Sequence, residues 1–185
     1  MMTIVMPMPI RLDKVALKIA AGTLPRAMPV IATDEVPDEA GVSFEPVHLE
    51  IDDVSHLQYT SGATRPPVGV EITHKAVGTN LIQMILSIDM LDRNTHGVSW
   101  LPLYHDMGLI GGLLQPIFSG VPCILMSPAY FLGRPLRWLE AISQYGGTIS
   151  GGPDFAYQLC AARVSDSALA RLDLSHWRVA YSGSE

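Results

Sequence analysis

A stretch of glycines, hydroxyl side chains and one arginine at positions 59–74, YTSGATRPPVGVEITH, has the composition of an anion-binding loop. Glycines permit backbone conformations that other residues avoid, hydroxyls donate hydrogen bonds, and arginine is a planar, permanent cation suited to phosphate. The spacing is not that of the GxxxxGK phosphate loop, and two prolines remove backbone donors, so an ordinary polar turn is the alternative. The residues that could bind the anion are Thr60, Ser61, Gly62, Thr64, Arg65 and Gly69.

Two further segments place chemically capable residues near the ends of predicted strands. In WLPLYHDMGLIGG (100–112), spacing alone favours Asp106 as a helix cap and His105 as a packing residue, with ligand binding or general-base catalysis as alternatives. In TISGGPDFAY (148–157), two glycines and an aromatic form either a tight turn or a wall of an apolar pocket. No nucleophile–base pair is evident, and GxSxG is absent. This suits a reaction in which a substrate carboxylate attacks phosphorus while the protein positions and neutralises charge.

The elements that must position these loops alternate between strands and helices. The predicted strands are residues 28–33, 56–62, 97–104, 121–126, 147–150 and 177–183. The predicted helices are residues 11–22, 107–120, 134–145 and 153–164, and residues 34–46 are expected to form a surface loop. The pattern predicts an α/β fold, a layered parallel sheet with covering helices, whose functional loops follow the strands and form one crevice.

One more helix is expected directly after the predicted anion-binding loop, with Thr73 as its N-cap. Apolar residues recur there at intervals of three and four, which is the period of an amphipathic helix. We interpret this stripe as core; it consists of Val77, Leu81, Met84, Ile85 and Ile88.

The composition limits the classes of partner. The 185 residues are 48% hydrophobic and 16% charged, which suits one domain, or part of a larger one, with a real core. The net charge of -6 argues against nucleic acid, and no apolar run is long enough for a membrane span. The start of the sequence does not resemble a signal peptide, the histidines show no zinc-ligand spacing, and Cys123 and Cys160 are predicted to be buried free thiols, as in a reducing cytoplasm.

Several motifs in order resemble those of one enzyme superfamily. YTSGATRPPVGVEITH resembles the signature loop of the adenylate-forming superfamily, which contains acyl-CoA synthetases, luciferases and peptide-synthetase adenylation domains. WLPLYHDMGLIGGLLQP, SPAYFLGRPLRWLEAIS, TISGGPDFAY and DLSHWRVAYSGSE are similar to its fatty-acyl-AMP ligase branch, and together the motifs cover residues 56–185. The resemblance implies ATP-dependent activation of a fatty acid to an acyl-adenylate. In that branch the acyl group passes to an acyl carrier protein or polyketide synthase.

The resemblance also implies roles for individual residues. It places His105 and Asp106 in the catalytic site beside the carboxylate. The implied nucleotide-binding residues are Thr60, Ser61, Gly62, Ala63, Thr64, Arg65, Gly69, Ser182, Gly183, Ser184 and Glu185. The implied residues of the acyl pocket are Met107, Gly108, Gly151, Gly152 and Phe155. Ala63 and Val68 stand where the superfamily has a hydroxyl residue and a lysine, and Arg65 partly restores the charge.

The resemblance makes residues 1–185 a partial AMP-binding domain, with 1–55 as a lead-in and 56–185 as the α/β core. The main magnesium ligand, the ribose-binding aspartate, the hinge, the catalytic lysine and the small C-terminal domain of the family are expected outside this sequence. We therefore expect the chain alone to adenylate little or nothing. The alternatives are a non-catalytic remnant or complementing fragment and, within the superfamily, a long-chain acyl-CoA synthetase.

Overall fold

A computed structural model describes residues 37–60, 66–88, 90, 92 and 94–183 of the chain. Two compact units are present, which we describe separately; the smaller comprises Met8–Glu50, and the larger contains Ile51–Glu185. In the smaller unit the 3-10 helix η1 (Asp38–Gly41) is followed by a segment without regular structure, as the predicted surface loop requires. The helix predicted at 11–22 and the strand predicted at 28–33 lie outside the described residues.

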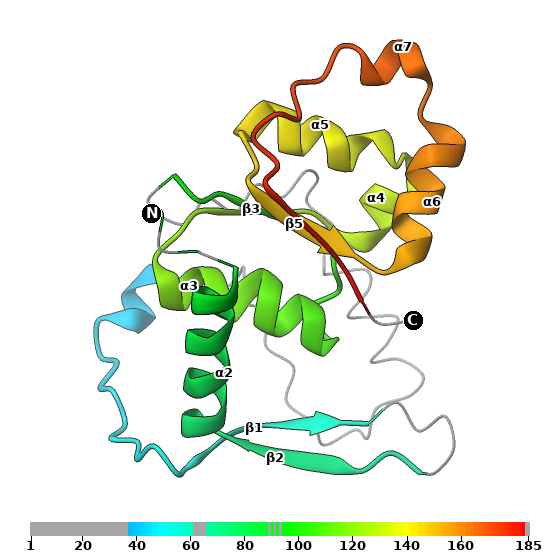
Figure 1. Cartoon of the computed structure of the whole chain (residues 1–185). Coiled ribbons are helices and arrows are strands. Elements are labelled where there is room, and N and C mark those ends of the chain that lie inside the picture. Colours follow the sequence, from blue (N-terminus) through cyan, green and yellow to red (C-terminus); the bar gives the residue numbers. More distant parts are fainter. Residues whose placement is uncertain (1–36, 61–65, 89, 91, 93, 184–185) are drawn as a thin grey trace. The chain divides into compact units, whose positions relative to one another are not determined.

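The larger unit contains a four-stranded parallel sheet in the order β4-β3-β5-β6. Its strands are β3 (Gly97–Ser99), β4 (Cys123–Leu125), β5 (Ile149–Gly152) and β6 (Val179–Ser182). Every residue of β3 and β5 is buried, because helices cover both faces of this sheet (Figure 1). The predicted α/β class with a covered parallel sheet is therefore confirmed.

One face of the sheet carries α4 (Pro128–Gly133), α5 (Leu136–Tyr145) and α6 (Asp154–Arg163), followed along the chain by α7 (Asp166–Leu169) (Figure 1). Aromatic side chains fill the space between these elements and the sheet. The Trp100 and Phe131 rings stack with centroids 4.1 Å apart, and Trp138 meets Phe131 edge-on at 5.7 Å. Trp138 also donates a 2.7 Å hydrogen bond from Nε1 to Ser150 Oγ.

The other face carries α2 (His74–Ser87), the π-helix η2 (Met107–Leu114) and α3 (Gln115–Ser119) (Figure 1). Thr73 caps α2 as predicted, since its side chain accepts from Ala76 N at 3.1 Å. In α2, Leu81 and Ile85 are buried.

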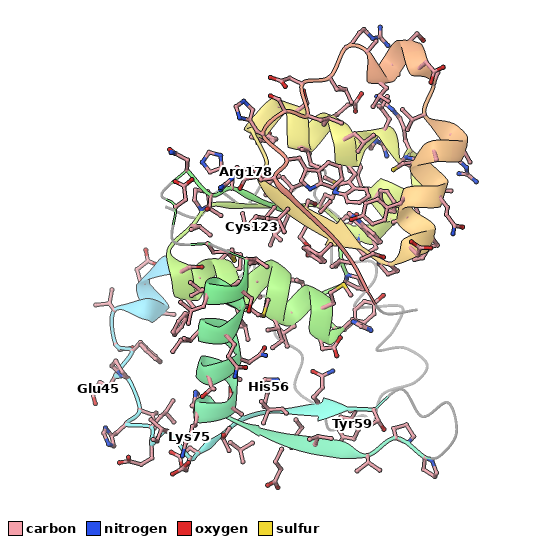
Figure 2. All side chains as sticks on the ribbon, viewed as in Figure 1. Glu45, His56, Tyr59, Lys75, Cys123 and Arg178 are labelled. Atoms are coloured by element: carbon pink, nitrogen blue, oxygen red, sulfur yellow. The ribbon has the colours of Figure 1, made fainter. Side chains whose placement is uncertain are left out.

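A separate two-stranded antiparallel hairpin precedes α2. It pairs β1 (Val54–Tyr59) with β2 (Gly69–Thr73). The first turn of α2 contacts the segment just before β1. Lys75 N donates to Ile51 O at 2.7 Å, and Lys75 Nζ lies 3.8 Å from Asp52 Oδ1. Tyr59 and Lys75 are both labelled in Figure 2.

The structure corrects several predicted boundaries. The strand predicted at 97–104 ends at Ser99, because Leu101 N donates to Ser99 Oγ and Pro102 has no N–H for a ladder. The strand predicted at 147–150 begins at Ile149 and extends to Gly152. The sequence interpretation missed β2, α4 and α7, although Ser127 before Pro128 is a recognisable helix start: Ser127 Oγ accepts from Tyr130 N at 3.2 Å.

The helix predicted at 107–120 is divided into η2 and α3. Pro116 has no N–H to donate to the carbonyl of Gly112, and the thiol of Cys123 donates to that carbonyl instead, at 3.4 Å. A π-helical segment of this kind is rare and is frequently found at functional sites.

Candidate functional site

An apolar cavity of about 650 Å³ lies between α2, η2 and the sheet face that they cover. Residues from seven elements line it, namely α2, β3, η2, α3, β4, β5 and β6, so positions between 80 and 181 in the chain contribute to one space. Its apolar lining includes Met84, Ile88, Met107, Ile110, Ile149 and Tyr181. A hydrocarbon chain is the kind of ligand that such a lining favours, because apolar surface is removed from water on both sides.

The predicted catalytic residues His105 and Asp106 lie where the chain enters η2. Asp106 lines the cavity and caps η2, with its Oδ1 accepting from Met107 N at 2.7 Å. His105 Nδ1 lies 2.7 Å from Asp106 Oδ1 and 3.3 Å from Met107 N. Both side chains are about half exposed or more, at 49% and 64%, so each can still reach a ligand. The capping role expected of Asp106 from spacing is confirmed. The packing role expected of His105 is wrong, because its side chain is exposed. Catalysis by this pair remains a prediction.

Two glycines let η2 lie directly against β3 and the loop that follows it. A Cβ on Gly108 would lie 2.1 Å from the carbonyl oxygen of Pro102, and a Cβ on Gly112 would lie 2.7 Å from Ser99 Oγ. Gly111, between them, faces open space: the nearest atom to its Cβ position is Met84 Cε at 3.9 Å. Gly108 and Gly112 therefore set the position of the cavity wall, and Gly111 leaves room inside it.

The end of β6 approaches the start of η2. A Cβ on Gly183 would lie 3.3 Å from Met107 Cε, and the Tyr181 hydroxyl lies 4.0 Å from the Cβ position of Gly111. Ser182 ends the strand and is exposed. The structure thus brings predicted residues of the nucleotide and acyl sites, Gly183 and Met107, next to each other.

Three of the predicted acyl-pocket residues lie elsewhere. Gly151 and Gly152 are inside β5, where added Cβ atoms would lie 2.2 Å from Tyr181 O and 2.6 Å from Trp100 Cζ2. Phe155 is 49% exposed and contacts Trp100 edge-on, with the ring centroids 6.1 Å apart. Gly152 and Phe155 adjoin Trp100 of the aromatic face, whereas Gly151 adjoins Tyr181, which lines the cavity. None of the three is among the residues that line the cavity; of the predicted five, Met107 lines it and Gly108 supports its wall.

The predicted phosphate loop is the turn of the β1–β2 hairpin. Thr60 N donates to Val68 O, and Val68 N donates to Thr60 Oγ1, both at 3.0 Å, so these two residues close the turn. The Tyr59 ring lies over Gly69, whose Cβ position is 3.2 Å from Tyr59 Cζ. The predicted ligand residues Ser61, Gly62, Ala63, Thr64 and Arg65, with Ser184 and Glu185, lie outside the described residues.

Burial suppresses ionisation of the groups beneath the cavity. Desolvation raises the pKa of the Cys123 thiol to about 12 and, as the largest cause, raises the pKa of Tyr181 to about 12. Cys123, labelled in Figure 2, lies between the sheet and η2. Cys123 and Cys160 are both free and buried, which confirms the prediction from sequence. A neutral floor of this kind favours an uncharged portion of a ligand.

No group of three or more His, Cys, Asp or Glu side chains that could hold a metal ion is found in the part of the chain that the structure describes. No helix there is long and apolar enough to cross a membrane.

The sequence interpretation missed most of the cavity. Met84 and Ile88 were assigned to the core with the rest of the α2 stripe, whereas they line the cavity. The motifs and the apolar period do not single out Asn80, Gln83 or Gln115, which also line it. The helical period of α2 predicts which residues share its inner face, but it does not distinguish a packed face from a hollow one.

Known proteins share this arrangement. Residues 9–185 match the family described as AMP-binding enzyme. The chain belongs to the AMP-binding enzyme family. Within this family it is 53% identical over 137 residues to a medium-chain fatty acid–acyl-carrier-protein ligase, TtuA, of Teredinibacter turnerae, covering 72% of this chain and 21% of that protein. It is 39% identical over 158 residues to a 4-hydroxyphenylalkanoate adenylyltransferase of Mycobacterium tuberculosis, covering 84% and 26%.

A solved AMP-binding enzyme has the same fold. The crystal structure of fatty acyl-adenylate ligase from L. pneumophila in complex with acyl adenylate and pyrophosphate superposes with a TM-score of 0.80 at 42% identity, covering 85% of this chain and 28% of that one. The chain thus spans about a quarter of the length of these relatives. The resemblance to the fatty-acyl-AMP ligase branch is confirmed by its relatives.

Proposed function

We propose that the protein containing this chain activates a fatty acid with ATP. The carboxylate oxygen forms a bond to the α-phosphorus, the bond from that phosphorus to the bridging oxygen breaks, and pyrophosphate leaves with the electron pair. The acyl-adenylate is the product. The observation that carries this proposal is the apolar cavity whose wall, η2, begins at the exposed His105–Asp106 pair. Such a cavity suits the acyl chain, and the polar pair lies at the helix end suited to its carboxyl group.

The hairpin turn suits the other substrate. Thr60 and Val68 close a turn whose sequence contains the hydroxyls, glycines and arginine of an anion-binding loop. We assign the ATP phosphates to this turn and the nucleotide to the segment after β6, where Gly183 lies beside Met107. An Arg65→Ala substitution should then weaken ATP binding; unchanged affinity in a titration would remove Arg65 from the phosphate site.

Magnesium is expected to accompany ATP, but the described residues contain no cluster fit to hold it, so we derive no step through it. We infer an acyl carrier protein as acceptor, supported by the T. turnerae relative that is named for this transfer. The carrier domain of a polyketide synthase offers the same thiol chemistry, and the second candidate acceptor is coenzyme A. A reducing compartment, the cytoplasm, suits the two free thiols.

A cavity-filling variant tests the fatty-acid site in the chain as it exists. Gly111→Leu adds a side chain where the nearest atom to the Cβ position is 3.9 Å away, so it should fill the cavity without moving the backbone. We expect a medium-chain fatty acid to bind the wild type and to bind Gly111→Leu at least tenfold more weakly in a calorimetric titration. The matched control is Gly78→Leu, because no atom lies within 4 Å of the Gly78 Cβ position, outside the cavity.

Equal binding by wild type and Gly111→Leu would place the acyl chain elsewhere and overturn the assignment. Incubation with ATP, magnesium and the fatty acid, followed by mass spectrometry for acyl-AMP, tests the chemistry separately. Fatty acid binding without any acyl-AMP, in the full-length protein, would favour the non-catalytic alternative.

A further inference from the structure

The first residues of three neighbouring strands form a row across the cavity floor. Gly97, Cys123 and Ile149 begin β3, β4 and β5, and all three line the cavity. Gly97 pairs in register with both of the others. Because parallel strands begin at the same edge of a sheet, this row, which we call the end row, lies opposite the edge where the strands end.

The π-helix η2 runs from the edge where the strands end toward the end row. At its start Met107 adjoins Gly183, which follows β6: a Cβ on this glycine would lie 3.3 Å from Met107 Cε. Near its end the carbonyl of Gly112 accepts from Cys123 Sγ at 3.4 Å. A fatty acid whose carboxyl group lies by Asp106, and whose chain follows η2, therefore has its methyl end at the end row.

The cavity lining is more buried at the end row than along η2. Cys123 and Ile149 are 2% and 6% exposed, and Met90, which lines the cavity and belongs to the same buried cluster as Ile149, is 5% exposed. By contrast, Met107 and Ile110 in η2 are half-buried. The cavity is thus open to water beside η2 and closed at the end row.

A separate polar hollow of about 460 Å³ adjoins the end row along β3 and β5. His96 and Thr148, which directly precede Gly97 and Ile149 in the chain, line this hollow. Backbone hydrogen bonds close the partition between the two spaces, because Thr148 N and Ile149 N both donate to His96 O, at 2.9 and 3.2 Å. An alkyl chain end gains little from a polar space, so it should stop at the end row.

Gly97 is the lowest point of the end row, because it has no side chain and lies between Cys123 and Ile149. A Cβ at this position would lie 3.0 Å from Cys123 Sγ. We propose that the end row stops the methyl end of the bound acyl chain over Gly97 and so sets the longest acyl chain that this site accepts. This inference rests on the proposed function and adds to it the residues that determine chain length.

A series of straight-chain fatty acids tests this in the chain as it exists. The acids from hexanoic to hexadecanoic, in steps of one carbon, are titrated into the protein in a calorimeter. Each methylene group that is buried in the cavity should tighten binding about fourfold. We expect this gain to stop at one chain length, which we call the break, because further carbons meet the end row.

Two small truncations of the end row should move the break. Ile149→Val and Cys123→Ala each shorten one wall side chain, so each should admit about one more carbon. Each should bind the acid just beyond the wild-type break about fourfold more tightly than the wild type does. The matched controls, Ile142→Val and Cys160→Ala, make the same changes in the aromatic cluster on the other face and should leave the break in place.

Circular dichroism checks that each variant folds, and the wild-type series decides by itself whether a break exists. Binding that tightens through the whole series without a break would overturn this inference and leave the proposed function standing. A break that stays in place in both end-row variants, or that moves equally in the two controls, would overturn the assignment to the end row. Binding of no acid at all would overturn the proposed function, and this inference with it.

Discussion

The two faces of the four-stranded sheet differ in how they are filled. On the α4–α6 face, Trp138 and Phe131 are completely buried and contact each other and Trp100. On the α2–η2 face the same strands border a cavity of about 650 Å³. Close packing contributes stability through many short contacts, whereas an open apolar space forgoes those contacts and is available to a ligand.

Successive side chains of a strand point to opposite faces of the sheet, so each short strand contributes residues to both faces. In β4, Cys123 lines the cavity while Ile124 joins the aromatic cluster. In β5, Ile149 lines the cavity while Ser150 accepts from Trp138. Stability and binding are therefore encoded by adjacent residues, so substitutions on the two faces should have separable effects.

The largest effect is expected on the packed face. Trp138→Ala removes a fully buried indole and its hydrogen bond to Ser150, and should lower the free energy of unfolding by about 3–5 kcal/mol. Met84→Ala, which enlarges a space that is already open, should cost less than half of that. Urea denaturation measures both, with the 46% exposed Leu132 changed to Ala as the control. Equal losses for Trp138→Ala and Met84→Ala would contradict the difference between the faces.

A smaller effect is expected where η2 contacts the loop that follows β3. Gly108→Ala would put a methyl group 2.1 Å from the Pro102 carbonyl, so the backbone must move, at a cost of about 1–3 kcal/mol. Gly111→Ala, three residues along the same helix, has free space and should be neutral or slightly stabilising. Thermal unfolding of the two variants compares them directly. If Gly111→Ala were as harmful as Gly108→Ala, the space beside η2 would not be open.

The burial of Tyr181 in the cavity floor should make the stability of the protein depend on pH in the alkaline range. The pKa of Tyr181 is raised from 10.0 to about 12, with burial as the main cause, so the folded protein keeps a proton that the unfolded chain loses. This stabilising contribution is fully present below pH 10 and is lost as the pH rises to about 12. In Tyr181→Phe the decline of stability over that range should be shallower by on the order of 1–2 kcal/mol. Denaturation curves collected across that pH range measure the difference, and parallel declines would argue against a buried phenol.

The smallest expected difference is between the two thiols, one on each face. Burial raises the pKa of Cys123 to about 12 and that of Cys160 to about 11, so neither is a reactive thiolate near neutral pH. Neither should be alkylated in the native chain, and both should be in denaturant, as mass spectrometry of labelled peptides can show. A fatty acid in the cavity should further slow labelling of Cys123 alone. Rapid native labelling of Cys123 would mean that the cavity floor is open to water.

Local features of the sequence predicted much of the fold. Thr73 was identified as a cap because its hydroxyl and the apolar period that follows are adjacent in the chain, and the structure confirms both. The parallel sheet was predictable because strands and helices alternate. The π-helical form of η2 was not predictable. It is accompanied by a hydrogen bond from Cys123 Sγ to Gly112 O, and Cys123 belongs to β4, which follows η2 and α3 in the chain.

The sequence by itself determined the family, the α/β class and the position of His105 and Asp106 at a helix start, because these depend on motifs and on neighbours in the chain. The tertiary structure decided that Met84, Gln115 and Tyr181 share one cavity, and that Gly152 adjoins Trp100 of the aromatic face. Whether an apolar stripe meets a packed layer or an open space depends on side chains that are distant in the sequence. A local sequence pattern contains no information about those side chains.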